Sequence, residues 1–181
     1  MRGTAVFRRA AFGAVAALTL ALTAVTAPAS AAPLVTTLTY DNSQAAEFKD
    51  AVDKGMEVWN TNAKNVKIVK VTPGQRANIT IIADDSWPHA ELGPVRANGS
   101  VTWWFGRQAS NYNHVRIAAH ETGHSLGLPD MKPGPCSSLM SGSTGGVDCA
   151  NVNPNASELS RVENNYAGTA ATNTHVLSAA Y

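Results

Sequence analysis

The chain has 181 residues, 14 of them Lys or Arg and 13 Asp or Glu, so its formal net charge at pH 7 is +1. A near-neutral chain lacks the charge pattern of proteins that bind nucleic acid or anionic membrane surfaces, and we expect neither as a partner. Its length is that of one ordinary domain with a core large enough to be stable.

Residues 1–32 are predicted to be an export signal rather than part of the fold. Three Arg residues form a positive start, residues 10–25 are apolar and uncharged, and Ala29–Ala31 offers a small-residue cleavage site. The apolar run is shorter than a membrane span needs. We therefore expect a secreted, extracellular protein, in which a few propeptide residues can follow the signal. Without the signal, 11 basic and 13 acidic residues remain, a net charge of −2.

Strands and one helix fill the first half of the expected mature chain. Residues 34–40 form a β-rich run, and residues 66–72 and 79–83 are predicted to be two further strands separated by a Pro-Gly pair. Between these runs, apolar residues three and four positions apart predict a helix with a buried face, formed by Ala45, Phe48, Val52, Met56 and Trp59. On that face a core role for Trp59 is favoured over stacking on a ligand.

The middle of the chain continues with a turn-rich connection over residues 87–98 and a strand over residues 101–105. Neighbouring residues on a strand face opposite sides, so one of Trp103 and Trp104 is expected in the core. A helix follows over residues 111–126, because apolar residues recur around its two histidines.

This helix contains His120-Glu121-Thr122-Gly123-His124, the pattern H-E-x-x-H. Residues four positions apart lie on one helix face, so both imidazoles can bind one Zn²⁺. Glu121 would then lie beside the open coordination position and could take a proton from water. A helix with histidines facing solvent or a core can carry the same five residues by chance. The residues that follow favour zinc binding.

Those residues supply a chain reversal and a third ligand. Gly127 stands where the helix should end, and glycine accepts the left-handed conformation of a helix C-cap. The chain can then turn back and bring an Asp130 carboxylate oxygen to the same metal. Three protein ligands and a water describe a catalytic zinc. Glu158 and Glu163, on a predicted last helix, are the alternative third ligands, but no local pattern supports them.

The segment H-E-T-G-H-S-L-G-L-P-D, with residues 135–142 after it, resembles the snapalysin family, the small secreted neutral metalloproteases of streptomycetes. The resemblance implies an α+β fold, a single metzincin-like zincin domain. It implies a twisted mixed β-sheet, an active-site helix, a supporting helix and a C-terminal helix. We expect this zinc metalloprotease domain over residues 33–167 and a flexible C-terminal tail over residues 168–181.

The resemblance also suggests roles for residues around the metal. It implies that Met140 lies in the Met-turn beneath the zinc, with a plain core methionine as the alternative. Lys132 stands close to the position of a family tyrosine, so it is expected either to stabilise the oxyanion or to be a solvated surface residue. Thr102, Trp103 and Trp104 are expected at a sheet edge that pairs with the extended substrate.

Two further sites are expected. The resemblance implies calcium binding through Asn113 and the carbonyl oxygen of Val115, and an amide is a weaker Ca²⁺ ligand than a carboxylate, which leaves calcium open. Cys136 and Cys149 are the only cysteines, and in an exported protein such a pair is expected to form a disulfide. Closing this loop should stabilise the fold by about 3 kcal/mol.

Together these residues predict a secreted endopeptidase with one Zn²⁺ per chain, bound by His120, His124 and Asp130. Glu121 is expected to activate a zinc-bound water that hydrolyses peptide bonds. The resemblance adds a preference for aromatic residues after the cleaved bond. We expect protein and peptide substrates as partners, and a monomer. The competing hypotheses are a secreted zinc-binding module without protease activity and a zinc hydrolase acting on non-peptide substrates.

Overall fold

The computed structural model describes residues 35–72, 74–168 and 177–180, together with Met1 and Gly3. Apart from these two positions, the expected signal over residues 1–32 lies outside the described residues. The chain divides into two units, residues 1–31 and 32–181, and the second contains every helix and strand that the structure describes. None of the described helices has the length and apolar character needed to cross a membrane.

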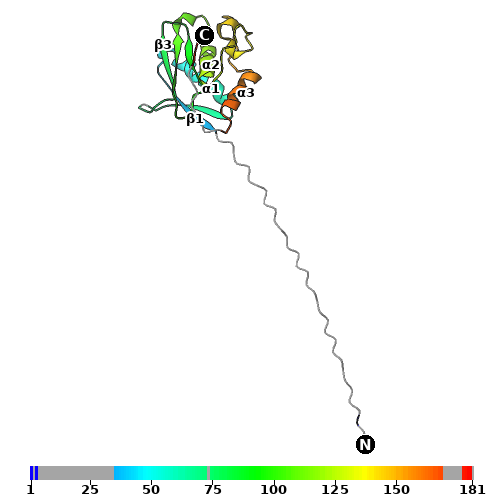
Figure 1. Cartoon of the computed structure of the whole chain (residues 1–181). Helices are drawn as coiled ribbons and strands as arrows, with labels where there is room; N and C mark the ends of the chain where they lie inside the picture. The colour runs from blue at the N-terminus through cyan, green and yellow to red at the C-terminus, as the bar shows by residue number, and fades with distance from the viewer. Residues whose placement is uncertain (2, 4–34, 73, 169–176, 181) are drawn as a thin grey trace. The chain divides into compact units, whose positions relative to one another are not determined.

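A mixed sheet forms the frame of the second unit (Figure 1). Its strands are β1 (Thr36–Gln44), β2 (Val66–Lys70), β3 (Ile79–Asp84), β4 (His89–Leu92), β5 (Val101–Gly106) and β6 (Leu177–Ala180). Their order across the sheet is β2-β1-β3-β5-β4-β6. Neighbours among β2, β1, β3 and β5 pair in parallel, whereas β4 is antiparallel to both β5 and β6. The mixed sheet of an α+β domain is confirmed.

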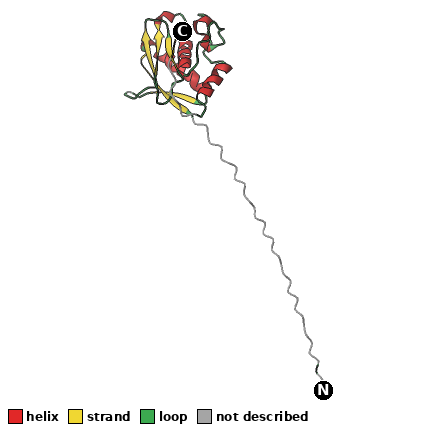
Figure 2. Ribbon diagram, viewed as in Figure 1, coloured by secondary structure: helices red, strands yellow, loops and turns green. Residues whose placement is uncertain are grey.

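The three α-helices are α1 (Lys49–Asn62), α2 (His114–Ser125) and α3 (Ala156–Asn165). Short 3₁₀ segments occur at Ala46–Phe48, Arg107–Ala109 and Leu139–Gly145. Figure 2 shows the helices gathered on one side of the strands. α1 and α2 approach very closely at Gly55, where a Cβ atom would lie 2.6 Å from the Cβ atom of Ala118. Only glycine permits this backbone separation, so Gly55 sets the position of α2 against α1.

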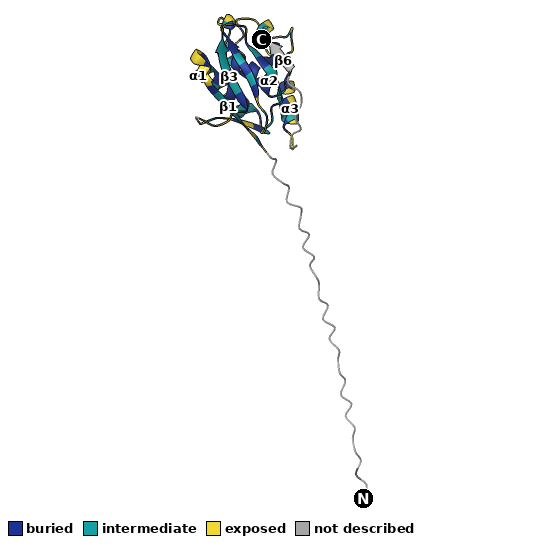
Figure 3. Cartoon of the chain, turned by 60° about the vertical axis from the view of Figure 1, so that its left-hand side comes forward, coloured by how far each residue is buried: buried dark blue, intermediate teal, exposed yellow. Residues whose placement is uncertain are grey.

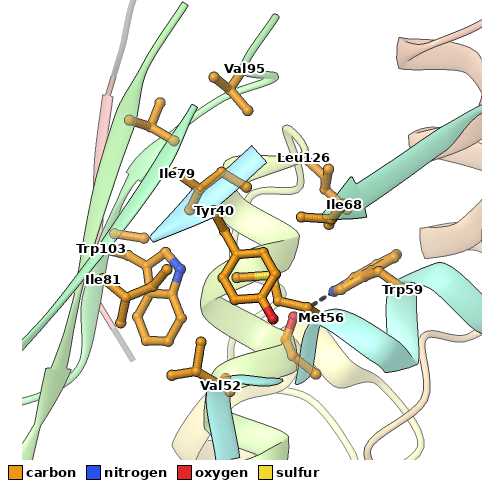
Figure 4. Close-up of a cluster of buried hydrophobic side chains, with 14 of the residues drawn as sticks. Tyr40, Val52, Met56, Trp59, Ile68, Ile79, Ile81, Val95, Trp103 and Leu126 are labelled. Atoms are coloured by element: carbon orange, nitrogen blue, oxygen red, sulfur yellow. Dashed lines mark hydrogen bonds between the residues drawn. The ribbon is translucent and has the colours of Figure 1, made fainter. Parts of the chain in front are cut away.

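The core lies between the sheet and these two helices. Tyr40, Ile79, Ile81 and Trp103 of the sheet pack with buried residues of α1, as Figure 4 shows. Trp59 of α1 is fully buried and its indole N–H donates to the carbonyl oxygen of Ala119 at 2.8 Å. The core role predicted for Trp59 is confirmed, and its hydrogen bond fixes α2 one residue before His120.

Two features of the sheet differ from the sequence-based expectation. Residues 87–98 were expected to be a connection, but four of them form β4. The segment Thr102–Trp104 was expected at a sheet edge, and this is wrong, because β5 has β3 on one side and β4 on the other. The strand pattern in the sequence identifies β5 but not its neighbours. As predicted, one tryptophan faces the core: Trp103 is fully buried, whereas Trp104 is partly exposed and stacks on His89.

The last described segment also corrects an expectation. Residues 168–181 were expected to be a flexible tail, but Leu177–Ala180 forms β6. This strand pairs with β4 in four register positions, from His89 with Ala180 to Leu92 with Leu177. The backbone groups of β4 that face away from β5 explain the pairing, because an exposed strand edge recruits any extended chain that reaches it.

Candidate active site

Helix α2 carries the H-E-x-x-H pattern inside the domain, and Figure 3 draws most of it in the colour of buried residues. Its first turn is capped by Asn113, whose Oδ1 accepts from the backbone N–H of Arg116 at 3.0 Å. A cap of this kind satisfies one of the unpaired N–H groups at a helix start. The Asn113 side chain therefore has a structural role, while calcium binding through Asn113 and Val115 stays a prediction.

The end of α2 has the geometry that Gly127 predicts. Gly127 has a φ of +92°, in the left-handed region. Its N–H donates to the carbonyl oxygen of His124, and the N–H of Leu128 donates to that of Gly123, both at 2.9 Å. These two bonds define a Schellman motif. The reversal brings the next residues back along the helix end, which places Asp130 beside the two histidines.

His120, His124 and Asp130 form a cluster that can hold a metal ion. The two Nε2 atoms are 3.1 Å apart, and Asp130 Oδ1 lies 3.3 Å from His120 Nε2 and 3.5 Å from His124 Nε2. Around a tetrahedral zinc with bonds of 2.0–2.1 Å, neighbouring ligand atoms are about 3.3 Å apart. The three donor atoms therefore already have the separations of three corners of such a tetrahedron.

Hydrogen bonds at the far side of each ring orient both imidazoles. Nδ1 of His120 lies 2.9 Å from the carbonyl oxygen of Leu139, and Nδ1 of His124 lies 2.7 Å from that of Leu128. A carbonyl oxygen only accepts, so Nδ1 carries the proton in each ring and Nε2 is the unprotonated nitrogen that can bind a metal. Burial lowers the pKa of His120 to about 4, which keeps this ring neutral at pH 7.

The pKa values of Asp130 and Glu121 are shifted in opposite directions. Burial alone would raise the pKa of Asp130, but interactions with His120 and His124 hold it below its usual range, so this carboxylate is ionised. Burial raises the pKa of Glu121 well above its ordinary value, and the charge of Asp130 raises it further, while Lys132 lowers it. Neither oxygen of Glu121 has a hydrogen-bond partner within the part of the chain that the structure describes. A buried carboxyl group without partners is costly, and such groups are found where chemistry needs them.

The turn Ser138–Gly142, which we refer to as the Met-turn, lies against α2. A Cβ atom on Gly123 would lie 2.7 Å from Met140 Sδ, so the methionine packs directly on the helix between the two histidines in sequence. Met140 is fully buried. Its backbone carbonyl oxygen accepts from the N–H of Met131 at 2.8 Å, which joins the turn to the residue after Asp130. The position favours the Met-turn interpretation of Met140 over a plain core residue.

Two buried charged residues that the sequence-based site did not include hold this turn. Glu158 accepts from the backbone N–H groups of Leu139 at 3.2 Å and Met140 at 2.9 Å, and from Ser138 Oγ at 2.6 Å. Arg116 donates to the carbonyl oxygen of Ser138 at 2.8 Å. Glu158 thus serves the turn and lies outside the cluster that can hold a metal ion.

For Glu158 a sequence signal existed. Asn155 and Glu158 have the spacing of a capping box, and both hydrogen bonds of that motif are present at the start of α3. The motif predicts a glutamate held at the helix start. For Arg116 there was no comparable signal, because its shortest hydrogen bonds go to the carbonyl oxygens of Ser138 and Asn151 and to Ser141 Oγ, each more than 20 positions away.

Lys132 and the disulfide complete the surroundings of the metal ligands. Lys132 Nζ lies 3.2 Å from Asp130 Oδ2, and a Cβ atom on Gly142 would lie 2.7 Å from Lys132 Cε and 3.3 Å from His120 Cε1. Lys132 is therefore partly exposed and lies next to the cluster of His120, His124 and Asp130. Cys136 and Cys149 form the expected disulfide, with Cα atoms 5.5 Å apart. It links the segment before the Met-turn to the segment that leads towards α3.

The part of the chain that contains this site is similar to known proteins. Residues 35–169 match the Streptomyces extracellular neutral proteinase (M7) family. A protein of Streptomyces caespitosus named extracellular small neutral protease is 37% identical over 134 residues, which cover 70% of this chain and 93% of that protein. A protein of the same name from Streptomyces coelicolor is 37% identical over 131 residues, 72% of this chain and 59% of that protein.

A third protein of this name, from Streptomyces lividans, is 35% identical over 135 residues, which cover 75% of this chain and 58% of that protein. The chain thus spans somewhat more than half the length of the Streptomyces coelicolor and Streptomyces lividans proteins and nearly all of the Streptomyces caespitosus protein. The family match extends from the start of β1 to beyond α3 and includes the metal-ligand cluster and the Met-turn. The chain therefore belongs to the Streptomyces extracellular neutral proteinase (M7) family.

Proposed function

We propose that the chain is a secreted zinc endopeptidase that hydrolyses peptide bonds of extracellular proteins. One observation carries the proposal: two imidazole nitrogens and one carboxylate oxygen converge at 3.1–3.5 Å beside a buried, unpartnered glutamate. The names of the relatives, extracellular small neutral protease, support both the reaction class and the export.

The chemistry of the donor set supports zinc as the metal. Two imidazoles and one carboxylate leave one tetrahedral position open, and soft sulfur ligands and large oxygen cages are both absent from this three-residue cluster. A zinc ion held by His120, His124 and Asp130 supplies Lewis acidity, which lowers the pKa of water towards about 7 and polarises the scissile carbonyl group.

Glu121 is the general base of the proposed reaction. Its carboxylate takes a proton from the attacking water and then transfers that proton to the leaving amine as the general acid. The raised pKa of this buried group suits the second step, because a carboxyl group with a higher affinity for the proton can carry it between the two positions. A positioned group of this kind contributes about 10²- to 10⁴-fold to the rate.

Lys132 is the proposed electrophilic group at the oxyanion. Its ammonium lies 3.2 Å from Asp130 Oδ2 and its side chain passes beside Gly142, so the charge is held close to the metal ligands. A fixed positive charge stabilises the negative oxygen that develops as the carbonyl carbon becomes tetrahedral. We further propose a preference for aromatic residues after the cleaved bond, on the family resemblance.

Hydrolysis of casein by the purified secreted chain, with and without 1,10-phenanthroline, tests the proposal. We expect cleavage that the chelator abolishes and that added Zn²⁺ restores. One zinc per chain without cleavage of casein or gelatin, in the wild type and in the Ser178→Pro and Ala179→Pro variants described below, would contradict the proposal. That result would favour the zinc-binding module.

A further inference from the structure

We propose that β6, the segment Leu177–Ala180, occupies the strand position on β4 that an extended peptide substrate takes, so that this segment competes with substrate. The inference rests on the proposed peptidase function. It concerns a part of the chain outside the family match, which ends at residue 169. β6 therefore lies outside the part of the chain that matches the family.

β4 lies next to the end of the strand order in the sheet. Without β6, β4 is the last strand, because its other neighbour is β5. The outward N–H and C=O groups of an edge strand bind extended peptides by strand addition. The other edge of the sheet is β2, which lies four strand spacings, or about 19 Å, from β4. Only one of these edges can adjoin the metal ligands.

β4 is the edge that lies beside α2, the helix of the two histidines. The chain leaving β4 is bound to the end of α2, since Gly93 N–H donates to the carbonyl oxygen of His124 at 2.8 Å and Val95 N–H donates to that of Ser125 at 2.9 Å. A Cβ atom on Gly93 would lie 2.0 Å from the Ser125 oxygen, so the two backbones are in direct contact. β4 is thus the edge tied to a metal ligand, His124. A peptide lying along β4 runs beside the helix that carries the metal ligands.

In the structure, β4 is paired with β6. β6 runs antiparallel to β4 over four consecutive register pairs, so both strands use the same ladder that an added peptide would use. None of its four residues is a proline, so each has a backbone N–H, and those that face β4 can donate to it. One ladder cannot be shared by two strands. Substrate binding on β4 therefore requires that β6 leave.

The strength of the competition follows from the tether. Residues 169–176 join β6 to the domain, and a short tether gives an effective concentration on the order of mM. If this effective concentration exceeds the Kd of the four-residue strand about 2- to 9-fold, β6 is bound for most of the time. Breaking the pairing should lower KM about 3- to 10-fold and leave kcat unchanged, because the chemical groups are untouched.

Two proline substitutions in the full chain form a matched pair. Residues next to each other on a strand point their N–H groups to opposite sides, so one of Ser178 and Ala179 donates to β4 and the other faces away. Ser178→Pro and Ala179→Pro therefore remove the same kind of group, but only one removes a ladder bond. We expect the lower KM in one variant only, together with faster hydrogen exchange of amides in His89–Leu92. Adding a synthetic peptide of residues 175–181 to that variant should raise KM again.

The outcomes separate this inference from the proposed function. Wild-type KM and wild-type amide exchange of β4 in both variants would overturn the competition while leaving proteolysis established. An equal fall of KM in both variants, without faster exchange of β4, would also overturn it. Absence of cleavage in the wild type and in both variants would refute the proposed function and the competition together, whatever the exchange of β4.

Discussion

Arg116 and Glu158 hold the same residue, Ser138: Arg116 Nη2 donates to the Ser138 carbonyl oxygen at 2.8 Å, and Ser138 Oγ donates to Glu158 Oε1 at 2.6 Å. The carbonyl oxygen of the next residue, Leu139, accepts a hydrogen bond from His120 Nδ1. A buried cation and a buried carboxylate thus both bind one turn, which lies directly behind His120. This arrangement links the fold of the C-terminal region to the orientation of His120.

The first prediction concerns Glu158. In Glu158→Gln an amide N–H₂ faces backbone N–H groups that the carboxylate now accepts, so at least one buried donor loses its partner. We expect the free energy of unfolding to fall by about 2 kcal/mol. We also expect zinc affinity to fall about 10-fold, because the turn that orients His120 shifts. Urea unfolding and a zinc-chelator competition measure the two effects.

Glu163→Gln is the matched control on the same helix. Glu163 accepts from the backbone N–H groups of Lys64 and Asn65, with a distance of 2.9 Å to Asn65. It resembles Glu158 in chemistry but contacts a loop that supplies no metal ligand. Its substitution should destabilise the fold by about 1–2 kcal/mol with unchanged zinc affinity. An equal loss of zinc affinity in both variants would contradict the role of Glu158.

The second prediction concerns the crossing of α1 and α2. Alanine is normally favoured over glycine in a helix by about 1 kcal/mol. At Gly55, however, a Cβ atom would lie 2.6 Å from Ala118 Cβ and 2.8 Å from the Ala118 backbone carbon. We expect Gly55→Ala to lower the free energy of unfolding by about 1–3 kcal/mol, because the helices must separate. Lys54→Ala, at the exposed neighbouring position, should change it by less than about 0.5 kcal/mol. A stabilised Gly55→Ala protein would show that the helices are not in contact there.

The third prediction concerns pH and the metal-free protein. Burial lowers the pKa of His120 from 6.5 to about 4, so between these values the unfolded chain binds a proton that the folded chain does not. Protonation of His120 therefore leaves the free energy of unfolding unchanged above about pH 6.5 and lowers it as the pH falls towards 4. Between pH 7.5 and 5 the loss should be about 2 kcal/mol, measured by urea unfolding in EDTA. His120→Gln should lack this part of the loss, and equal stability of the wild type at both pH values would contradict the burial of a neutral ring.

The fourth prediction concerns the disulfide between Cys136 and Cys149, which are 13 residues apart. Replacing both by Ser should lower the free energy of unfolding by about 3 kcal/mol, because the unfolded chain gains loop entropy. The zinc site should persist in the folded variant, since the carbonyl oxygens that bind Arg116 belong to the backbone. Thermal unfolding with zinc bound measures the first effect and metal analysis the second. Unchanged stability would mean that the unfolded variant keeps this loop closed by other means.

The metal-ligand cluster was predictable from the sequence because it is local. His120 and His124 are one helical turn apart, and Gly127 alone provides the reversal that brings Asp130 back. Short-range geometry of this kind follows from residue spacing without knowledge of the rest of the fold. The helices α1 and α3 were predictable for the same reason, from their apolar periodicity. Of the two, only α3 has a side-chain cap, Asn155.

Long-range pairing was not predictable in the same way. β4 has only four residues and lies between Pro88 and Pro94, so the sequence favoured a loop, and the sheet edge was then assigned wrongly to Thr102–Trp104. The residues of β4 and β6 that pair with each other are about 90 positions apart in the sequence. Backbone pairing of this kind leaves little trace in residue types. The role of Arg116 likewise depends largely on carbonyl groups that any residue could supply. The capping box of α3 marks Glu158 but does not show which distant amides this carboxylate binds.

Parallel measurement of peptidase activity and zinc content in the wild type and in Glu121→Gln tests the central claim most directly. The substitution keeps the size of the side chain and both histidines, and removes only the group that transfers the proton. We predict one zinc per chain in both proteins and a fall in kcat of about 10²- to 10⁴-fold in the variant. A Glu121→Gln protein that binds zinc and cleaves casein at the wild-type rate would contradict the account.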